Sequence, residues 1–214
     1  MTQQPKLPYI ECNGVIVTDS DFCIKHLVKE GVSNDLDVNL TPEQKVDGRA
    51  WQAYLEEKIY PCVVKQRWLD EPNYTNIVNT MLRSVVWPVR SVVGWNLSRK
   101  IYHALWAQGT ARHSDEEIES LMQDAVSDMV VKSQGKRYFH GTETFTTTDI
   151  VVYSFLSSGL LTTFDINWNR LVLSQITLVK YCLHMTESLF PEYEPLLKKL
   201  RETESNLEFT SPKL

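Results

Sequence analysis

Short apolar runs in the first part of the chain are typical of β-strands. Tyr9–Cys12 and Val15–Val17 flank the dipeptide Asn13-Gly14. A type I′ turn needs positive φ at both central positions, so Asn-Gly between two such runs predicts a tight β-hairpin. Thr18 can then cap a helix, with Asp21 at the third helical position of a capping box. That helix is expected to bury apolar residues on one side and to end near Gly31; they are Phe22, Cys23, Leu27 and Val28.

From Thr41 onward the apolar spacing becomes helical. Thr41-Pro42-Glu43-Gln44 supplies a capping Thr, a Pro at the first helical position and a Gln at the third. The spacing predicts a helix from there to Trp68, with a kink at Pro61 because proline has no N–H to donate. A second helical region is predicted over roughly Thr75–Gln108, interrupted near Trp87-Pro88.

Capping signals place the remaining helices. Ser114–Glu117 is a capping box with an acidic first turn, and apolar residues follow at helical spacing as far as Gly135. Thr146–Asp149 starts a further helix through Leu156. A last amphipathic helix is predicted from about Asn169 or Ser174 to Leu189, and after it a short segment, Leu196–Arg201, leads into a polar tail. We expect the helical residues to form the core.

The change from a mixed to an all-helical pattern lies between Asn34 and Leu40. We therefore divide the chain into two domains, residues 1–38 and residues 39–214. A two-stranded hairpin has little stability of its own, so we expect the first domain to be the least stable part of the chain.

Tryptophan is concentrated in the helical part, where five of the six lie between Trp51 and Trp106. Aromatic residues at helical spacing usually fill a core, and we expect that here. The alternative is a groove for a hydrophobic small molecule, with Trp87-Pro88-Val89-Arg90 bringing a side chain to its mouth.

Composition and charge exclude several classes of protein. The 214 residues are 43% hydrophobic and 23% charged, which excludes low-complexity and disordered chains. The net charge of −5 argues against nucleic-acid binding, and no apolar stretch is long enough to span a membrane. The four scattered cysteines favour buried free thiols in a reducing compartment. We therefore expect a cytoplasmic protein, or alternatively one on the cytosolic face of an organelle membrane.

No metal site or catalytic constellation stands out among the histidines and cysteines. The spacings lack His-x-x-x-His and Cys-x-x-Cys, so we expect no metal ligands. His113 follows Arg112 just before a predicted helix. We expect it to be a linker residue at that helix N-terminus, with no chemical role. Cys12 and Cys23 fall in the hairpin-helix region, where buried packing is the expected use and a redox role the alternative.

Several short segments follow one another in a characteristic order. They are Lys6–Glu11 with Asn13-Gly14, Asp19-Ser20, Gln108-Gly109 with Arg112–Ser114 and Glu116–Ile118, Gly141 with Thr146–Asp149, Tyr181-Cys182, and Phe190-Pro191. Together they resemble the glutathione S-transferase-like proteins of the failed-axon-connections and metaxin-related branch, to which nematode cadmium-responsive proteins are similar. The resemblance implies a mostly α fold, in which a truncated thioredoxin-like hairpin and helix precede an all-helical transferase domain. It also implies that Thr146 and Asp149 form a structural capping box.

The resemblance further implies where glutathione would bind. The strand entered through a cis-proline corresponds to Leu7 and Pro8, and the acidic-Ser pair that opens the third thioredoxin-like helix corresponds to Asp19 and Ser20. A helix N-terminus offers unpaired N–H groups to the γ-glutamyl carboxylate. The alternative is that Thr18, Asp19 and Ser20 only cap a helix.

The same resemblance argues against catalysis. The family's thiol-activating Tyr, Ser or Cys lies in a first strand or helix that has no counterpart in Met1–Pro5. We therefore expect no catalytic residue, no required cofactor and a non-catalytic binding or interaction module, with glutathione or a hydrophobic small molecule as ligand and a homodimer or another protein as partner. A cadmium- or stress-response role is implied by the resemblance alone. The alternative function is a glutathione-dependent transferase represented here by a shortened isoform.

Overall fold

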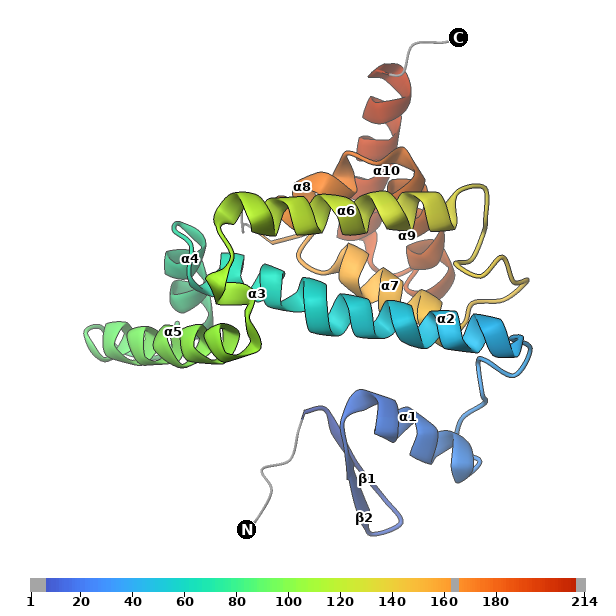
Figure 1. Cartoon of the computed structure of the whole chain (residues 1–214), viewed down its shortest axis with the longest axis horizontal. Helices are drawn as coiled ribbons and strands as arrows, with labels where there is room; N and C mark the ends of the chain where they lie inside the picture. The colour runs from blue at the N-terminus through green and yellow to red at the C-terminus, as the bar shows by residue number, and fades with distance from the viewer. Residues whose placement is uncertain (1–6, 163–165, 211–214) are drawn as a thin grey trace. The chain divides into compact units, whose positions relative to one another are not determined.

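The computed structural model describes residues 7–162 and 166–210 (Figure 1). Its backbone contacts divide the chain into two units, the first ending at Thr41 and the second beginning at Pro42. Helices dominate the second unit, and the described part of the first holds one hairpin and one helix. The chain is thus mostly α, with a partial thioredoxin-like unit before an all-helical unit, as the sequence predicts.

The first unit opens with the predicted hairpin. Strands β1 (Tyr9–Cys12) and β2 (Val15–Thr18) pair antiparallel, with Cys12 opposite Val15. Asn13 and Gly14 both have positive φ, 50° and 76°, so the predicted turn is confirmed. The helix α1 (Ser20–Lys29) follows, but its N-cap is Asp19 rather than Thr18, since the Asp19 side chain accepts a hydrogen bond from the Asp21 N–H at 3.1 Å.

The second unit starts with an almost continuous rod of three elements, α2 (Pro42–Ala53), a π-helical stretch η1 (Tyr54–Ile59) and α3 (Tyr60–Trp68). Figure 1 shows them following one another along one line, in blue to cyan. The predicted disturbance at Pro61 takes the form of the wider π turns just before it. Proline occupies the start of α3, where its missing N–H leaves no helical bond unmade.

Five helices pack with this rod to enclose one core. They are α6 (Asp115–Ser133), α7 (Thr147–Ser157), α8 (Asn167–Leu173), α9 (Ile176–Leu189) and α10 (Glu194–Thr210). The core includes Leu55, Ile118, Met129, Leu178 and Trp168, all almost fully buried. Helix α2 approaches α7 closely at Gly48, where a Cβ would collide with the Thr148 hydroxyl.

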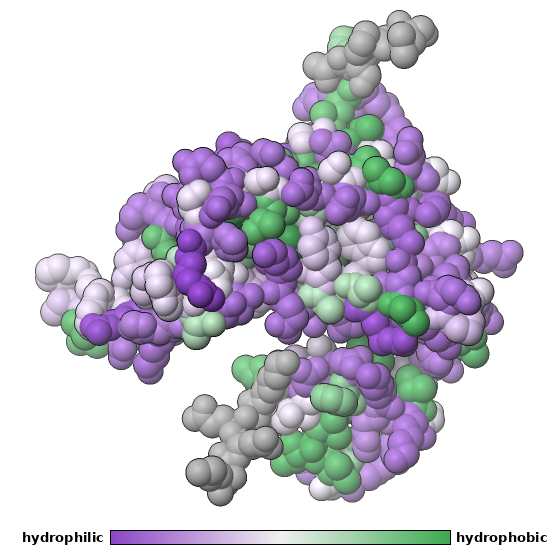
Figure 2. Space-filling view, viewed as in Figure 1, coloured by the Kyte–Doolittle hydropathy of each residue, from purple (hydrophilic) through white to green (hydrophobic). Residues whose placement is uncertain are grey.

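The helices α4 (Asn73–Met81) and α5 (Val89–Gln108), with a short 3₁₀ turn η2 (Thr110–Arg112), lie outside that core. None of the described residues between 64 and 117 belongs to the core cluster. The expectation that the tryptophans fill the core is wrong for this segment, since Trp87, Trp95 and Trp106 are 78%, 57% and 48% exposed. In Figure 2 the end of the molecule where α4 and α5 meet, at the far left, is white to green rather than purple.

The C-terminal helix also differs from expectation. Instead of ending near Arg201, α10 continues to Thr210. Two ion pairs to α9 accompany it, Arg201 with Glu187 and Lys180 with Glu208, each at 2.7 Å. Among the described residues, none of the helices is both long enough and apolar enough to cross a membrane.

We predict that the hairpin exchanges its amide hydrogens faster than the helical core. Cys23 and Leu40 are the only buried side chains among described residues 7–41, and a two-stranded sheet leaves both edges unpaired. Hydrogen exchange measured by mass spectrometry checks this. Protection of Tyr9–Val17 equal to that of α6 and α9 would show the expectation to be wrong.

Candidate functional site

The start of α1 gathers the residues that the resemblance assigns to glutathione. The Leu7–Pro8 peptide bond is cis, and the Asp19 N–H donates to the Pro8 carbonyl oxygen at 2.9 Å. This bond places the strand entrance beside the helix start. Ser20 is the first residue of α1 and is exposed, as is Leu7. The structure therefore brings Leu7, Pro8, Asp19 and Ser20 together in the first unit.

Asp19 holds an uncommon backbone conformation, with φ 76° and ψ 134°. Residues other than glycine rarely adopt positive φ, and such conformations concentrate at binding and active sites. The bond to Pro8 and the side-chain cap on the Asp21 N–H hold Asp19 in place. The N–H groups of the first turn of α1 therefore have a fixed direction.

The cysteines in the helical unit are buried thiols. Burial raises the pKa of Cys182, which is fully buried in α9, and that of Cys62 in α3. The Cys62 thiol donates to the Lys58 carbonyl oxygen at 3.3 Å. In the first unit, the buried Cys23 thiol donates to the Val17 carbonyl oxygen at 3.3 Å. A thiol with a raised pKa is a poor nucleophile, so Cys62 and Cys182 fit packing rather than chemistry.

His113 lies just before α6, beside the residues that cap this helix. Ser114 and Glu117 form a reciprocal capping box, and His113 Nδ1 lies 3.2 Å from Glu117 Oε2. Across the described ranges, 7–162 and 166–210, three or more His, Cys, Asp or Glu side chains nowhere gather as a metal site would require.

A buried carboxylate organises the helical unit. Asp149 is 0% exposed and lies in the first turn of α7, where Thr146 is the N-cap. Its Oδ2 accepts from the Thr146 N–H at 2.8 Å and from the Thr146 hydroxyl at 2.7 Å. Its Oδ1 accepts from the Phe139 N–H at 2.7 Å and from the Tyr181 hydroxyl at 2.6 Å. Burial and the Asp149 charge raise the pKa of Tyr181, so its hydroxyl remains a donor.

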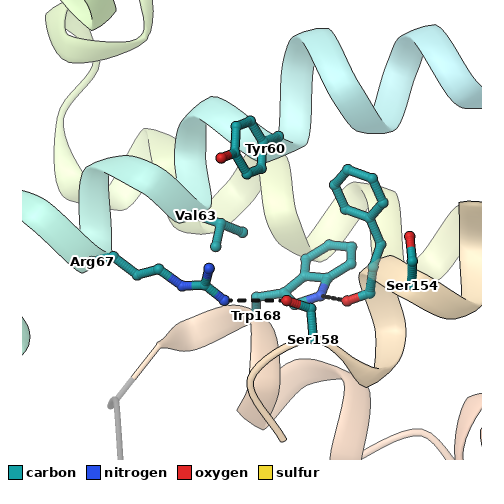
Figure 3. Close-up of a pocket in the computed structure, with 7 residues that line it drawn as sticks. Tyr60, Val63, Arg67, Ser154, Ser158 and Trp168 are labelled. Atoms are coloured by element: carbon teal, nitrogen blue, oxygen red, sulfur yellow. Dashed lines mark hydrogen bonds between the residues drawn. The ribbon is translucent and has the colours of Figure 1, made fainter. Parts of the chain in front are cut away.

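A cavity of about 240 Å³ opens between α3, α7 and α8 (Figure 3). Tyr60, Val63 and Arg67 line it from one face of α3, because residues three and four positions apart share a helix face. Helix α7 and the residue that follows it contribute Ser154, Phe155 and Ser158, and α8 contributes Trp168. The Trp168 indole N–H donates to the Phe155 carbonyl oxygen at 2.9 Å, so its ring forms an apolar wall. A second hollow of about 660 Å³, lined by Tyr153, Phe190 and Tyr193 among others, shares Ser154 and Ser158 with the first.

Neither the cavity nor Arg67 was anticipated from the sequence. The spacing of Tyr60, Val63 and Arg67 was the available signal, since it places all three on one helix face. Their partners on α7 and α8 lie about ninety residues further along the chain, so only the tertiary structure brings them together.

Comparison with known proteins assigns the first part of the chain. Residues 1–73 match the family model described as the glutathione S-transferase N-terminal domain. The first 73 residues thus resemble that transferase domain. The similar proteins agree with that assignment at low identity. No solved structure matches the chain.

Two of the similar proteins cover most of this chain. Mouse (Mus musculus) Metaxin-1 is 26% identical over 187 residues, which cover 84% of this chain and 58% of metaxin. Failed axon connections of Drosophila melanogaster is 25% identical over 218 residues, covering 93% of this chain and 50% of that protein. The chain thus spans about half the length of the curated relatives it matches. An isoprene-epoxide glutathione S-transferase of Rhodococcus is 28% identical over 131 residues, 58% of this chain and 55% of that enzyme.

We predict that Asp149→Asn destabilises the transferase-like fold by about 2–4 kcal/mol, since hydrogen bonds to a buried charged group contribute about 1.5–3 kcal/mol each. The NH₂ group of the new amide would also face a hydrogen-bond donor of Thr146 or Tyr181, and two donors cannot bond to each other. Tyr181→Phe removes one of these bonds and should cost about 1.5 kcal/mol. Urea unfolding measures both. Asp124→Asn, at an exposed position of α6, is the matched control, and an equal effect there would contradict the role of Asp149.

Proposed function

We propose that this chain is a non-catalytic interaction module of the glutathione S-transferase-like branch that includes Metaxin-1 and Failed axon connections. The observation that carries the proposal is one exposed side of α5. There a row of side chains, which we term the α5 stripe, follows the helical spacing of three and four; its members are Val92, Trp95, Arg99, Tyr102 and Trp106. All five are exposed, and none contributes to the core.

The α5 stripe has the composition of a protein-binding surface. The Arg99 guanidinium lies 5.4 Å from the centroid of the Trp95 ring, and the Tyr102 and Trp106 rings lie 5.9 Å apart. Such contacts restrict the side chains before any partner arrives. Tryptophan, tyrosine and arginine are the residues that most often dominate binding energy at interfaces. An exposed row of them on a helix outside the core supports a role in recognition.

The basic charge of the segment that carries the stripe favours an acidic partner, although Asp70 and Asp115 line the same hollow as Trp95 and Arg99. Between Pro72 and Ser114 the sequence has no Asp or Glu, whereas it has five basic residues, Arg83, Arg90, Arg99, Lys100 and Arg112. All 27 acidic residues of the chain lie elsewhere. Pairing of two copies through this face would bring like charges together, so a different protein with an acidic surface fits it better.

A photo-crosslinking amino acid at position 95 tests the interaction in cells that express the chain. We expect a discrete crosslinked protein from position 95 and none from the exposed position 124 on α6. Because the attraction is electrostatic, raising the salt from roughly 0.15 M to about 0.5 M should weaken the complex. The double variant Arg99→Glu with Lys100→Glu should also remove the crosslink. Equal crosslinking from both positions, or none from position 95, would contradict the proposal.

Glutathione binding at the start of α1 is a second candidate function, favoured by the fixed backbone of Asp19. The N–H groups of the first turn can donate hydrogen bonds to a carboxylate, and the helix dipole favours a negative charge there. The exposed Ser20 hydroxyl adds a donor. The backbone of Leu7 lies next to Pro8, where the family pairs the cysteinyl part of glutathione. We propose Leu7, Pro8, Asp19 and Ser20 as this site.

Titration of the ¹⁵N-labelled chain with glutathione tests the second candidate by NMR. We expect saturable shifts of the Leu7 and Ser20 amides and weaker binding by Ser20→Ala, which loses a hydroxyl donor. Ser33→Ala, near the other end of α1, is the control and should bind as the unaltered chain does. Absence of saturable shifts at about 10 mM glutathione, roughly tenfold above a millimolar Kd, would remove this candidate.

The finer roles implied by the resemblance belong to the same proposal. They are a cadmium- or stress-response role and a location in the cytoplasm or on the cytosolic face of an organelle. The alternative, a glutathione-dependent transferase, draws support from the identity with the Rhodococcus enzyme. A change in the abundance of the crosslinked complex on cadmium exposure would support the stress role, and an unchanged complex would count against it.

A further inference from the structure

The cavity between α3, α7 and α8 is lined by a cation, Arg67, that pairs with no carboxylate in the described part of the chain. The Arg67 Nη2 donates to the Ser158 hydroxyl at 3.4 Å, a long hydrogen bond, and is joined to it by a dashed line in Figure 3. Arg67 Nε is buried and has no hydrogen-bond partner in the described part of the chain. Burial lowers the pKa of Arg67, and no described carboxylate pairs with it. A half-buried guanidinium whose Nε–H has lost water without gaining a hydrogen bond is costly.

A second unsatisfied polar atom lies close to Arg67. Asn169 donates its amide to the Gly159 carbonyl oxygen at 3.0 Å, but its Oδ1 is buried without a partner. Gly159 has φ +86°, and a Cβ there would lie 3.2 Å from both Arg67 Nη2 and Asn169 Nδ2. The backbone thus passes between the two polar side chains only because residue 159 has no side chain. Asn169 does not line the cavity, so the hydrogen-bonding capacity left open there is that of Arg67.

The rest of the cavity is apolar. Val63, Phe155 and the ring of Trp168 form its walls, and Trp168 is 1% exposed. Tyr60 stands at the more exposed side, with its ring edge-to-face on Phe155 at 6.5 Å. A ligand that fits here has an apolar body against these walls and one anionic end at the guanidinium.

We propose that the cavity bounded by Arg67, Ser158 and Trp168 binds a small organic monocarboxylate with an aromatic or short aliphatic body. A carboxylate matches the planar fork of a guanidinium, and the Ser158 hydroxyl can supply a further donor. Phosphate and sulfate carry more charge and have no apolar part, so a single arginine in an apolar cavity suits them poorly. About 240 Å³ accommodates a ligand of the size of benzoate. This site is separate from the α5 stripe and from the start of α1.

Benzoate is the probe for the test, with benzamide as its neutral isostere. Titration of the ¹⁵N-labelled full chain is followed by NMR at the Arg67 Nε–H and the Trp168 indole N–H. We expect saturable shifts of both resonances with benzoate and at least about tenfold weaker binding of benzamide, equivalent to about 1.4 kcal/mol. Arg67→Met should weaken benzoate binding by at least about tenfold, and Arg67→Lys should also weaken it, since ammonium lacks the planar fork. Arg201→Met, at an exposed ion pair on α10, should leave the affinity unchanged.

Thermal unfolding distinguishes binding from a structural role. If Arg67 serves a ligand, Arg67→Met removes a half-buried cation that pairs with no described carboxylate, and the Tm of the unliganded chain should stay equal or rise. If Arg67 instead holds the helices together, the Tm falls, and the proposal is overturned. It is also overturned if benzoate does not saturate, or if benzamide binds equally well. An Arg67 Nε–H that is already protected from exchange and does not respond to benzoate would show that the chain itself satisfies the cation. None of these outcomes depends on glutathione or on the α5 partner.

Discussion

The carboxylate of Asp149 accepts hydrogen bonds from three separate segments, and the helical unit depends on that convergence. The loop before α7 donates through Phe139, the helix start through Thr146, and α9 through Tyr181. A buried carboxylate is tolerated only when its oxygens are satisfied, so these donors have one compatible arrangement. That arrangement fixes α7 relative to α9, and α7 in turn supplies one wall of the cavity.

Because the core closes around α6 to α9 and the first rod, α4 and α5 are left outside it. Their exposed tryptophans therefore add nothing to core packing, which leaves them open to selection for recognition. The same core leaves Arg67 at its margin, where no described carboxylate pairs with it. The α5 stripe and the cavity thus both lie where the helical unit leaves apolar surface exposed or a polar group without a partner in the described chain.

Prediction from the sequence succeeds where local chemistry determines the structure. Asn13-Gly14 and the Ser114 capping box predict their elements correctly, because positive φ and N–H capping are local requirements. Prediction fails where the structure depends on which distant part of the chain packs against a segment. The apolar periodicity of α5 does not reveal that Trp95 is 57% exposed, and α10 continues past Arg201 into a stretch paired with α9, as Glu208 is with Lys180. The cavity could not be predicted either, since Arg67 and Trp168 come from distant segments.

The proposal of binding without catalysis has a physical basis at the start of α1. The side chains there are the Asp19 carboxylate and the Ser20 hydroxyl, and a nearby negative charge opposes the formation of a thiolate. Turnover of glutathione with a chlorodinitrobenzene substrate by the purified chain tests this most directly. The account predicts a rate equal to that of the uncatalysed reaction in buffer. Robust turnover that is lost in Ser20→Ala would contradict it and favour the transferase.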